Sequence, residues 1–257
     1  DYNVLSQYRY EFHPVTLSPG ERDDYIELSK EITEKYHQYR SSEDEPIIQV
    51  ADRYGDLRTA ITERADIIKE CTEKTEVVED IIDDVGRKTL VFCNTVDHAK
   101  EVSNRIQKAS PRSSGVFLGE QNDAQRARFL SYFEEGDLKI LVSIDCLTEG
   151  VDVPACDSAI FITNSTSERE SIQRRGRVLR KSEEDEVAQI HDFVTFPRSW
   201  SEIESGVNME SCEIRLAHRE LKRATRMAEA AKNEALVRAK VISRRRELPE
   251  LKQNVSY

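Results

Sequence analysis

Short apolar runs alternate with amphipathic segments through the middle of the chain. Thr89–Cys93 and Lys139–Ile144 are runs of the kind found in strands buried on both faces. Further strands are predicted at 115–118, 158–163 and 186–195. Helices are predicted between the strands, starting near Asp97 as N-cap, over 123–135 with Gly136 closing it, and over 168–179. This alternation predicts an α/β fold, a doubly wound parallel sheet covered on both faces and centred on residues 88–197.

The segments before and after this centre read as mostly helical. The first twenty residues predict an extended strand and a turn at Ser18–Gly20. From Glu21, apolar side chains recur at steps of three and four, which predicts a helix; they are Tyr25, Leu28, Ile32, Tyr36 and Tyr39. A polar loop is expected at 41–46, followed by helices at 56–71 and 74–84 that stop before Gly86.

The C-terminal part has a heptad pattern made largely of alanine. Its positions step by three and four residues and are Ile214, Ala217, Leu221, Ala224, Ala228, Ala231 and Ala235. A seam of small side chains lets a partner helix approach closely. The favoured interpretation is that this helix folds back on the domain; a dimeric coiled coil is the alternative.

Charge is distributed unevenly along the chain. The net charge is −11, yet the segment Met209–Tyr257 carries 12 Lys/Arg against 7 Asp/Glu. An acidic body with a basic tail suggests two surfaces with different partners. No apolar run approaches the ~20 residues that a membrane span needs, so no membrane partner is expected.

Cysteine usage bears on the cellular compartment. The five cysteines form no C-x-x-C pair and are odd in number, which argues against a disulfide framework. We therefore expect a reducing intracellular compartment, either the cytoplasm or the nucleoid or nucleus. The start is polar and is not Met, so we expect a piece of a longer protein without a signal peptide.

The most informative segment is Gln173–Arg180, which reads Gln-Arg-Arg-Gly-Arg-Val-Leu-Arg. Arg174, Arg177 and Arg180 are spaced by three residues and therefore lie on one face of the predicted helix. Guanidinium groups offer two parallel donors that match a phosphate. The alternative is a solvated basic face paired with nearby glutamates.

A second segment, Ile144–Pro154, follows the carboxyl end of a predicted buried strand, where open α/β sheets bind their ligands. Gly150 can supply an unusual backbone angle, and Asp152 can accept a hydrogen bond from a ribose hydroxyl. Alone, this segment also fits an ordinary loop between two strands.

Together, the two segments resemble motifs V and VI of the second RecA-like domain of a superfamily 2 helicase or translocase. Leu90–Thr95 resembles motif IV of the same family. The wording is most similar to the restriction-enzyme-motor and excision-repair branch. DEAD-box RNA helicases carry Thr in place of Ile144 and His in place of Gln173.

The resemblance implies roles for individual residues. Arg177 and Arg180 would be arginine fingers on the β- and γ-phosphates of ATP, a contribution of about 10³–10⁵ in rate. Gln173, Arg174, Gly150 and Asp152 would bind the nucleotide. Asn94, Thr95 and Thr148 would contact nucleic-acid phosphates through neutral donors.

The sequence lacks G-x-x-x-x-G-K-[ST] and has no acidic D-E-x-x run after an apolar strand. Relatives of this kind hold the phosphate loop and the Mg²⁺ carboxylates in the first RecA-like domain. We therefore expect half an ATP–Mg²⁺ site, inactive alone, with that first domain as partner and no metal ligands in this chain.

The expected organisation has four parts. Residues 1–20 resemble the strand that crosses between the two RecA-like domains, 21–86 form a helical segment, 87–200 the RecA-like domain and 201–257 a helical basic extension.

The favoured function is the second motor domain of an ATP-dependent DNA helicase or translocase, with double-stranded DNA preferred. The alternatives are a non-catalytic RecA-like scaffold whose helical tail binds a protein partner, and an RNA helicase motor. The five histidines show no metal-ligand spacing along the chain, and Cys93 and Cys146 read as core residues. Arg244–Arg246 could contact a nucleic-acid backbone, although a solvated helix end is favoured.

Overall fold

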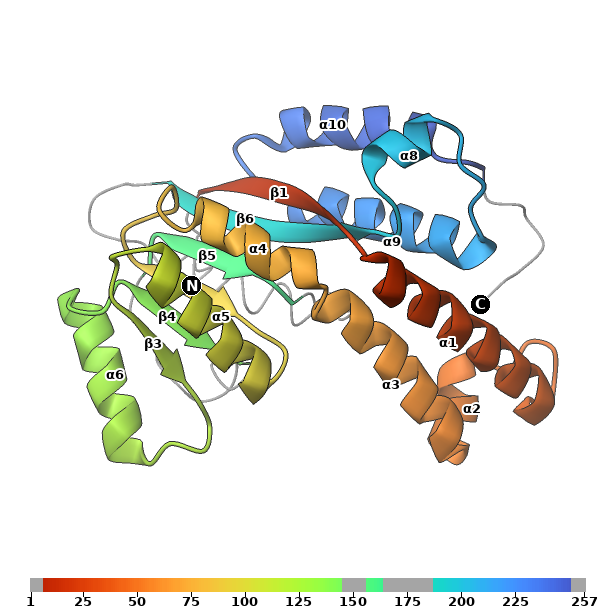
Figure 1. The fold of residues 1–257 in the computed structure, drawn as a ribbon, viewed down its shortest axis with the longest axis horizontal. Coiled ribbons are helices and arrows are strands. Elements are labelled where there is room, and N and C mark those ends of the chain that lie inside the picture. Colours follow the sequence, from red (N-terminus) through yellow and green to blue (C-terminus); the bar gives the residue numbers. More distant parts are fainter. Residues whose placement is uncertain (1–6, 145–155, 164–186, 251–257) are drawn as a thin grey trace, which may run out of the picture.

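The computed structural model describes residues 7–144, 156–163 and 187–250. Six strands form a single sheet in the order β1-β6-β5-β2-β4-β3, and every neighbouring pair is parallel (Figure 1). The strands are β1 (Tyr8–Thr16), β2 (Thr89–Phe92), β3 (Ser114–Phe117), β4 (Ile140–Ser143), β5 (Ser158–Phe161) and β6 (Ala188–Phe196).

Helices connect the strands and extend the chain at both ends. They are α1 (Pro19–Tyr39), α2 (Ile47–Arg53), α3 (Gly55–Lys69), α4 (Thr72–Ile81), α5 (Val96–Ala109), α6 (Asp123–Glu135), α8 (Trp200–Glu204), α9 (Ser211–Met227) and α10 (Glu234–Glu247). The predicted doubly wound parallel sheet is confirmed. Helix α2 was not predicted, and the predicted helix at 168–179 lies outside the described residues.

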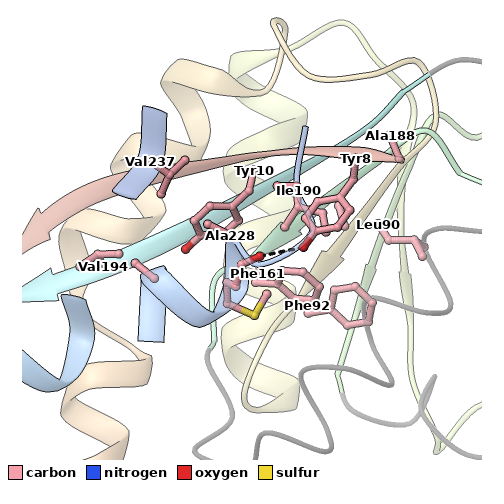
Figure 2. Close-up of a cluster of buried hydrophobic side chains, with 14 of the residues drawn as sticks. Tyr8, Tyr10, Leu90, Phe92, Phe161, Ala188, Ile190, Val194, Ala228 and Val237 are labelled. Carbon is pink, nitrogen blue, oxygen red and sulfur yellow. Dashed lines mark hydrogen bonds between the residues drawn. The ribbon is translucent and has the colours of Figure 1, made fainter. Parts of the chain in front are cut away.

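The strands are buried on both faces because their side chains alternate between two apolar clusters. In β2, Leu90 and Phe92 point to the cluster that includes side chains of α6, α9 and α10. Val91 joins the opposite cluster, which includes side chains of α4 and α5. Figure 2 shows the first of these clusters, where the aromatic rings of β1 lie close to Ala228 and Val237 from the C-terminal part. This double coverage explains the unbroken apolar runs in the sequence.

Local signals mark where several helices begin and end. Ser18 caps α1 with a reciprocal capping box to Glu21, and Asn122 does the same for α6 with Gln125. Gly136 ends α6 in the left-handed region with φ 84°, as its predicted role requires. The N-cap of α5 is Thr95, whose hydroxyl accepts the backbone N–H of His98; the prediction of Asp97 as cap was wrong by two residues.

Gly86 follows α4 and has a packing role. A Cβ at this position would lie 2.2 Å from Oδ1 of Asp157. That carboxylate accepts the backbone N–H groups of Arg87 and Lys88, which fixes the approach to β2. Only a residue without a side chain leaves room for this contact.

Helices α1, α2 and α3 form a small bundle that extends beyond the sheet (Figure 1). It has its own apolar cluster, which comprises Ile32, Tyr36, Val50, Ala51, Leu57 and Ala60. Stacked rings of Tyr39 and Tyr54, with centroids 4.1 Å apart, join the end of α1 to the junction of α2 and α3.

The C-terminal helices fold back on the sheet, as the favoured interpretation expected. Ala217, Leu221 and Ala224 of α9 are fully buried beside β6. The seam is not one helix, however, because the chain leaves the helix after Met227 and Ala235 is exposed on α10.

The segment between α9 and α10, where the heptad pattern breaks, supplies hydrogen-bond partners to the open edge of β1. The side-chain amide of Asn233 accepts the backbone N–H of Tyr10 at 3.0 Å and donates to its carbonyl at 2.9 Å, and the backbone N–H of Lys232 donates to Tyr8. An uncovered edge strand would expose these backbone groups. The tail therefore completes the sheet edge as well as its apolar face. None of the helices in the described ranges has the length and apolar character needed to cross a membrane.

Candidate functional site

The carboxyl ends of three central strands meet at one edge of the sheet. Phe92, the last residue of β2, pairs with Ser143 of β4 on one side and with Phe161 of β5 on the other. The backbone N–H of Cys93 donates to Ser143 at 2.7 Å, and that of Thr163 donates to Phe92 at 3.2 Å. The three strand ends are thus held level by direct hydrogen bonds.

The three segments that the sequence singled out all start from these strand ends. Asn94 and Thr95 follow β2, residues 145–155 follow β4, and residues 164–186 follow β5. Ligands of open α/β sheets bind outside the carboxyl ends of the strands. The connectivity therefore brings the origins of all three segments to the edge where a ligand is expected.

Most of the predicted site residues lie outside the described residues. These are Thr148, Gly150 and Asp152 in the segment after β4, and Gln173, Arg174, Arg177 and Arg180 in the segment after β5. Their roles stay predictions. Asn94 and Thr95 are the predicted site residues whose surroundings the structure describes.

Asn94 and Thr95 face two carboxylates at the C-terminal end of α3, Asp66 within the helix and Glu70 as its C-cap. The amide of Asn94 donates to Glu70 Oε1 at 2.9 Å and to Asp66 Oδ1 at 3.2 Å, and the hydroxyl of Thr95 donates to Glu70 Oε1 at 3.1 Å. Two of the three donors predicted to meet phosphate, Asn94 and Thr95, are therefore held by acidic groups. A phosphate that binds here must displace Glu70.

Lys74 is a buried cation next to the end of β5. Its side chain is fully buried, and its ammonium donates to the carbonyl of Ile162 at 2.9 Å. Burial lowers the pKa of Lys74 to about 8, against a smaller opposing effect of the Glu220 carboxylate. The ammonium thus anchors the backbone just before residues 164–186. Sequence reasoning missed it because a lysine on an amphipathic helix resembles a solvated one.

A buried ionic cluster joins β6 to α9. The Arg223 guanidinium donates to Asp192 at 2.6 Å, to Glu220 at 2.9 Å and to the carbonyl of Phe193 at 2.7 Å. Burial alone would lower the pKa of Arg223, but the carboxylates of Asp192 and Glu220 outweigh it and raise that pKa. Tyr10 donates to Asp192 at 2.6 Å, and burial with this carboxylate raises the pKa of Tyr10 well above its usual value. The cluster positions the tail on the sheet and was not foreseen from the sequence.

Two histidines distant in sequence lie in contact on neighbouring strands. Nε2 of His13 on β1 is 3.1 Å from Nδ1 of His191 on β6, and 178 residues separate them. Burial lowers the pKa of both imidazoles, to about 4 for His191. Spacing along the chain carries no sign of this contact, because parallel pairing of the first and last strands creates it.

The cysteines in the described part of the chain are core residues with free thiols. They are Cys71, Cys93, Cys156 and Cys212. Burial raises the pKa of Cys71 to about 12 and moves the other three in the same direction. These thiols are therefore not activated nucleophiles. Cys93 is a core residue as predicted, and Cys146 lies outside the described residues.

The fold is RecA-like. The solved structure named as the C-terminal part of the Fun30 ATPase domain superposes with a TM-score of 0.54 over 77% of this chain and 87% of that chain, at 11% identity. This likeness confirms the predicted α/β, RecA-like fold class.

Comparison of the sequence with protein families finds a family that matches part of the chain. Residues 73–182 match the family described as helicase conserved C-terminal domain. The match includes the predicted motifs and fewer than half of the 257 residues.

Relatives with RNA and with DNA in their names are both similar to this chain. The protein irc3 of Schizosaccharomyces pombe, an ATP-dependent helicase by name, is 34% identical over 41% of this chain. "ATP-dependent RNA helicase DBP3" of Phaeosphaeria nodorum is 30% identical over 38% of the chain. "DNA 3'-5' translocase XPB2" of Sulfurisphaera tokodaii is 26% identical over 58% of the chain. The chain spans only 17%, 16% and 33% of the length of those proteins, and the relatives do not agree on RNA or DNA in their names.

Proposed function

We propose that this chain is the second motor domain of an ATP-dependent DNA helicase or translocase, with double-stranded DNA as the preferred track. The observation that carries the proposal is the common origin of three motif-bearing segments at the level carboxyl ends of β2, β4 and β5. ATP with Mg²⁺ is the substrate, bound between this edge and a first RecA-like domain that supplies the phosphate loop and the Mg²⁺ carboxylates.

The arginines after β5 carry the chemical role. Arg177 and Arg180 act as fingers that neutralise charge on the transferring phosphoryl group, which is worth about 10³–10⁵ in rate. Gln173, Arg174, Gly150 and Asp152 bind and orient the nucleotide. The 257 residues contain no G-x-x-x-x-G-K-[ST] sequence, so the chain alone should not hydrolyse ATP.

Asn94, Thr95 and Thr148 contact the nucleic-acid backbone in this proposal. The carboxylate of Glu70 accepts from both Asn94 and Thr95 in the structure and therefore competes with phosphate for the same donors. Nucleic-acid binding thus requires Glu70 to turn away, and its negative charge opposes binding until it does.

The preference for DNA rests on the wording of the motifs. Ile144 and Gln173 differ from the DEAD-box pattern, and a relative named as a DNA translocase matches 58% of the chain. An RNA motor is the second candidate, because relatives named as RNA helicases match 38% and 48% of the chain. The scaffold alternative is disfavoured by the burial of Ala217, Leu221 and Ala224 against the sheet, which leaves no open alanine seam for a partner helix.

The decisive experiment measures ATP hydrolysis by the protein that carries both RecA-like domains. Arg177→Ala should lower nucleic-acid-stimulated hydrolysis by about 10³-fold or more and leave the melting temperature unchanged. Arg58→Ala, which removes an exposed arginine of α3, is the matched control and should have wild-type turnover. Stimulation by double-stranded DNA, single-stranded DNA and RNA distinguishes the two motor candidates. Near-wild-type turnover of Arg177→Ala would reject both.

A further inference from the structure

Three side chains with metal-ligand chemistry meet on one face of β1 and β6. Glu11 and His13 are two residues apart on β1 and therefore point to the same side of the sheet. The parallel register places His191 of β6 opposite Glu11. The potential ligand atoms of all three lie within 4.8 Å of one another.

The two imidazoles are already close to the spacing that a metal ion requires. Tetrahedral Zn²⁺ with bonds of about 2.0–2.1 Å places its donor atoms roughly 3.3 Å apart. His13 Nε2 and His191 Nδ1 are 3.1 Å apart. The Glu11 side chain is exposed and therefore free to rotate its carboxylate toward the two nitrogens.

Nε2 of His191, the ring nitrogen that does not face His13, lies near an oxygen acceptor, as the second nitrogen of a metal-binding histidine usually does. His191 Nε2 lies 3.4 Å from the side-chain oxygen of Gln189, the next residue on the same face of β6. Ligating histidines commonly donate their other N–H to such an oxygen, which leaves the remaining nitrogen for the metal.

We propose that Glu11, His13 and His191 form a binding site for a divalent transition metal ion, with Zn²⁺ as the preferred ion. Two imidazoles and one carboxylate are a donor set that Zn²⁺ accepts, and they leave a fourth position for water. The ion would join β1 to β6, its neighbour among the described strands, and so fasten β1 to the sheet. This role is independent of the proposed ATP site.

The site is tested on the 257-residue chain after removal of metal with a chelator. Zn²⁺ should bind at one ion per chain by calorimetry and raise the melting temperature by about 5 °C at a concentration near 100 times its Kd. Co²⁺ should give the visible spectrum of nitrogen and oxygen ligation without thiolate charge-transfer bands. The absence of thiolate bands would show that Co²⁺ binds at Glu11, His13 and His191 and not at the buried cysteines.

Variants assign the ligands. His13→Gln should weaken Zn²⁺ binding by at least about 100-fold, and Gln189→Leu by about 10-fold, because outer partners typically contribute 10–100-fold. His37→Gln, an exposed histidine of α1, is the control and should bind as wild type. His191→Gln removes a buried side chain and could unfold the chain. Glu11→Gln changes an exposed position instead, and this second variant should also weaken Zn²⁺ binding.

Three results would overturn the site. They are no Zn²⁺ binding by the wild-type chain, equal binding by wild type and folded His13→Gln, and Co²⁺ spectra dominated by thiolate bands. Each can be obtained whatever the outcome of the ATP hydrolysis experiment.

Discussion

The Arg223 guanidinium of α9 lies 2.6 Å from the Asp192 carboxylate of β6, and water reaches little of either group. The Asp192 side chain is 0% exposed and that of Arg223 is 16% exposed. Removal of one partner of such a pair leaves a buried charge without compensation, which costs more than the pair itself contributes. The C-terminal tail is therefore tied to the sheet by a contact that tolerates little change.

Arg223→Leu should lower the free energy of unfolding by about 3–5 kcal/mol, because Asp192 and Glu220 lose their shared cation. Urea unfolding at neutral pH measures this loss. Arg238→Leu on α10 is the matched control, because its pair with Glu234 is exposed at 48% and 35% and should contribute less than about 1 kcal/mol. Equal losses in the two variants would contradict the structural role of the buried pair.

Lys74 should make stability depend on pH in the alkaline range. Its pKa is about 8 in the folded chain, because of burial, and near 10.4 when unfolded. Between these values the unfolded chain binds a proton that the folded chain has released, so the contribution of this group to stability rises with pH. Over the window the gain is on the order of 3 kcal/mol.

The measurement compares wild type with Lys74→Met in urea at pH 7, 8, 9 and 10. The wild-type stability should improve relative to the variant as pH rises. Buried thiols such as Cys71, with pKa raised to about 12, produce the opposite trend in both proteins and cancel in the difference. A difference that stays flat with pH would show that Lys74 does not titrate in this range.

Ala224→Leu should destabilise the protein by about 1–3 kcal/mol, because the fully buried alanine of α9 leaves no room for a larger side chain. Ala235→Leu belongs to the same heptad pattern but lies exposed on α10, and should change stability by less than about 0.5 kcal/mol. Thermal unfolding distinguishes the two. If Ala235→Leu were as damaging as Ala224→Leu, the helices would not pack as the structure has them.

Glu70→Gln should strengthen nucleic-acid binding by about 3–10-fold at low salt if Asn94 and Thr95 contact phosphate, because a competing negative charge is removed. Fluorescence anisotropy with labelled DNA measures the change in the protein carrying both motor domains. Glu63→Gln changes the net charge by the same amount at an exposed position of α3 and should have little effect on nucleic-acid binding. Equal strengthening by both variants would indicate a general charge effect and not a contact at Asn94.

Most of the fold could be predicted from the sequence because periodicity reports local structure. The apolar run at Thr89–Cys93 and the capping residues around α6 correspond closely to the elements observed. Helix α2 was missed because its seven residues are too short for a periodic signal and begin directly after Pro46.

Contacts between distant segments were beyond the reach of sequence patterns. The break after Met227 depends on Asn233 reaching the edge of β1, and the burial of Lys74 depends on its place beside β5. The motif segments were recognised from the types and order of their residues. The carboxylate of Glu70 beside Asn94 was not foreseen, because 24 residues separate the two.

The pairing of β1 with β6 has a consequence for synthesis of the protein. Tyr8 pairs with Ala188, and β6 is the neighbour of β1 among the described strands, so β1 leaves the ribosome long before this partner exists. At about 5–20 residues per second, this delay lasts on the order of ten to forty seconds. During that interval Tyr8 and Tyr10 of β1 lack the apolar cluster that buries them in the folded chain. The nascent chain can complete its sheet only after β6 has emerged.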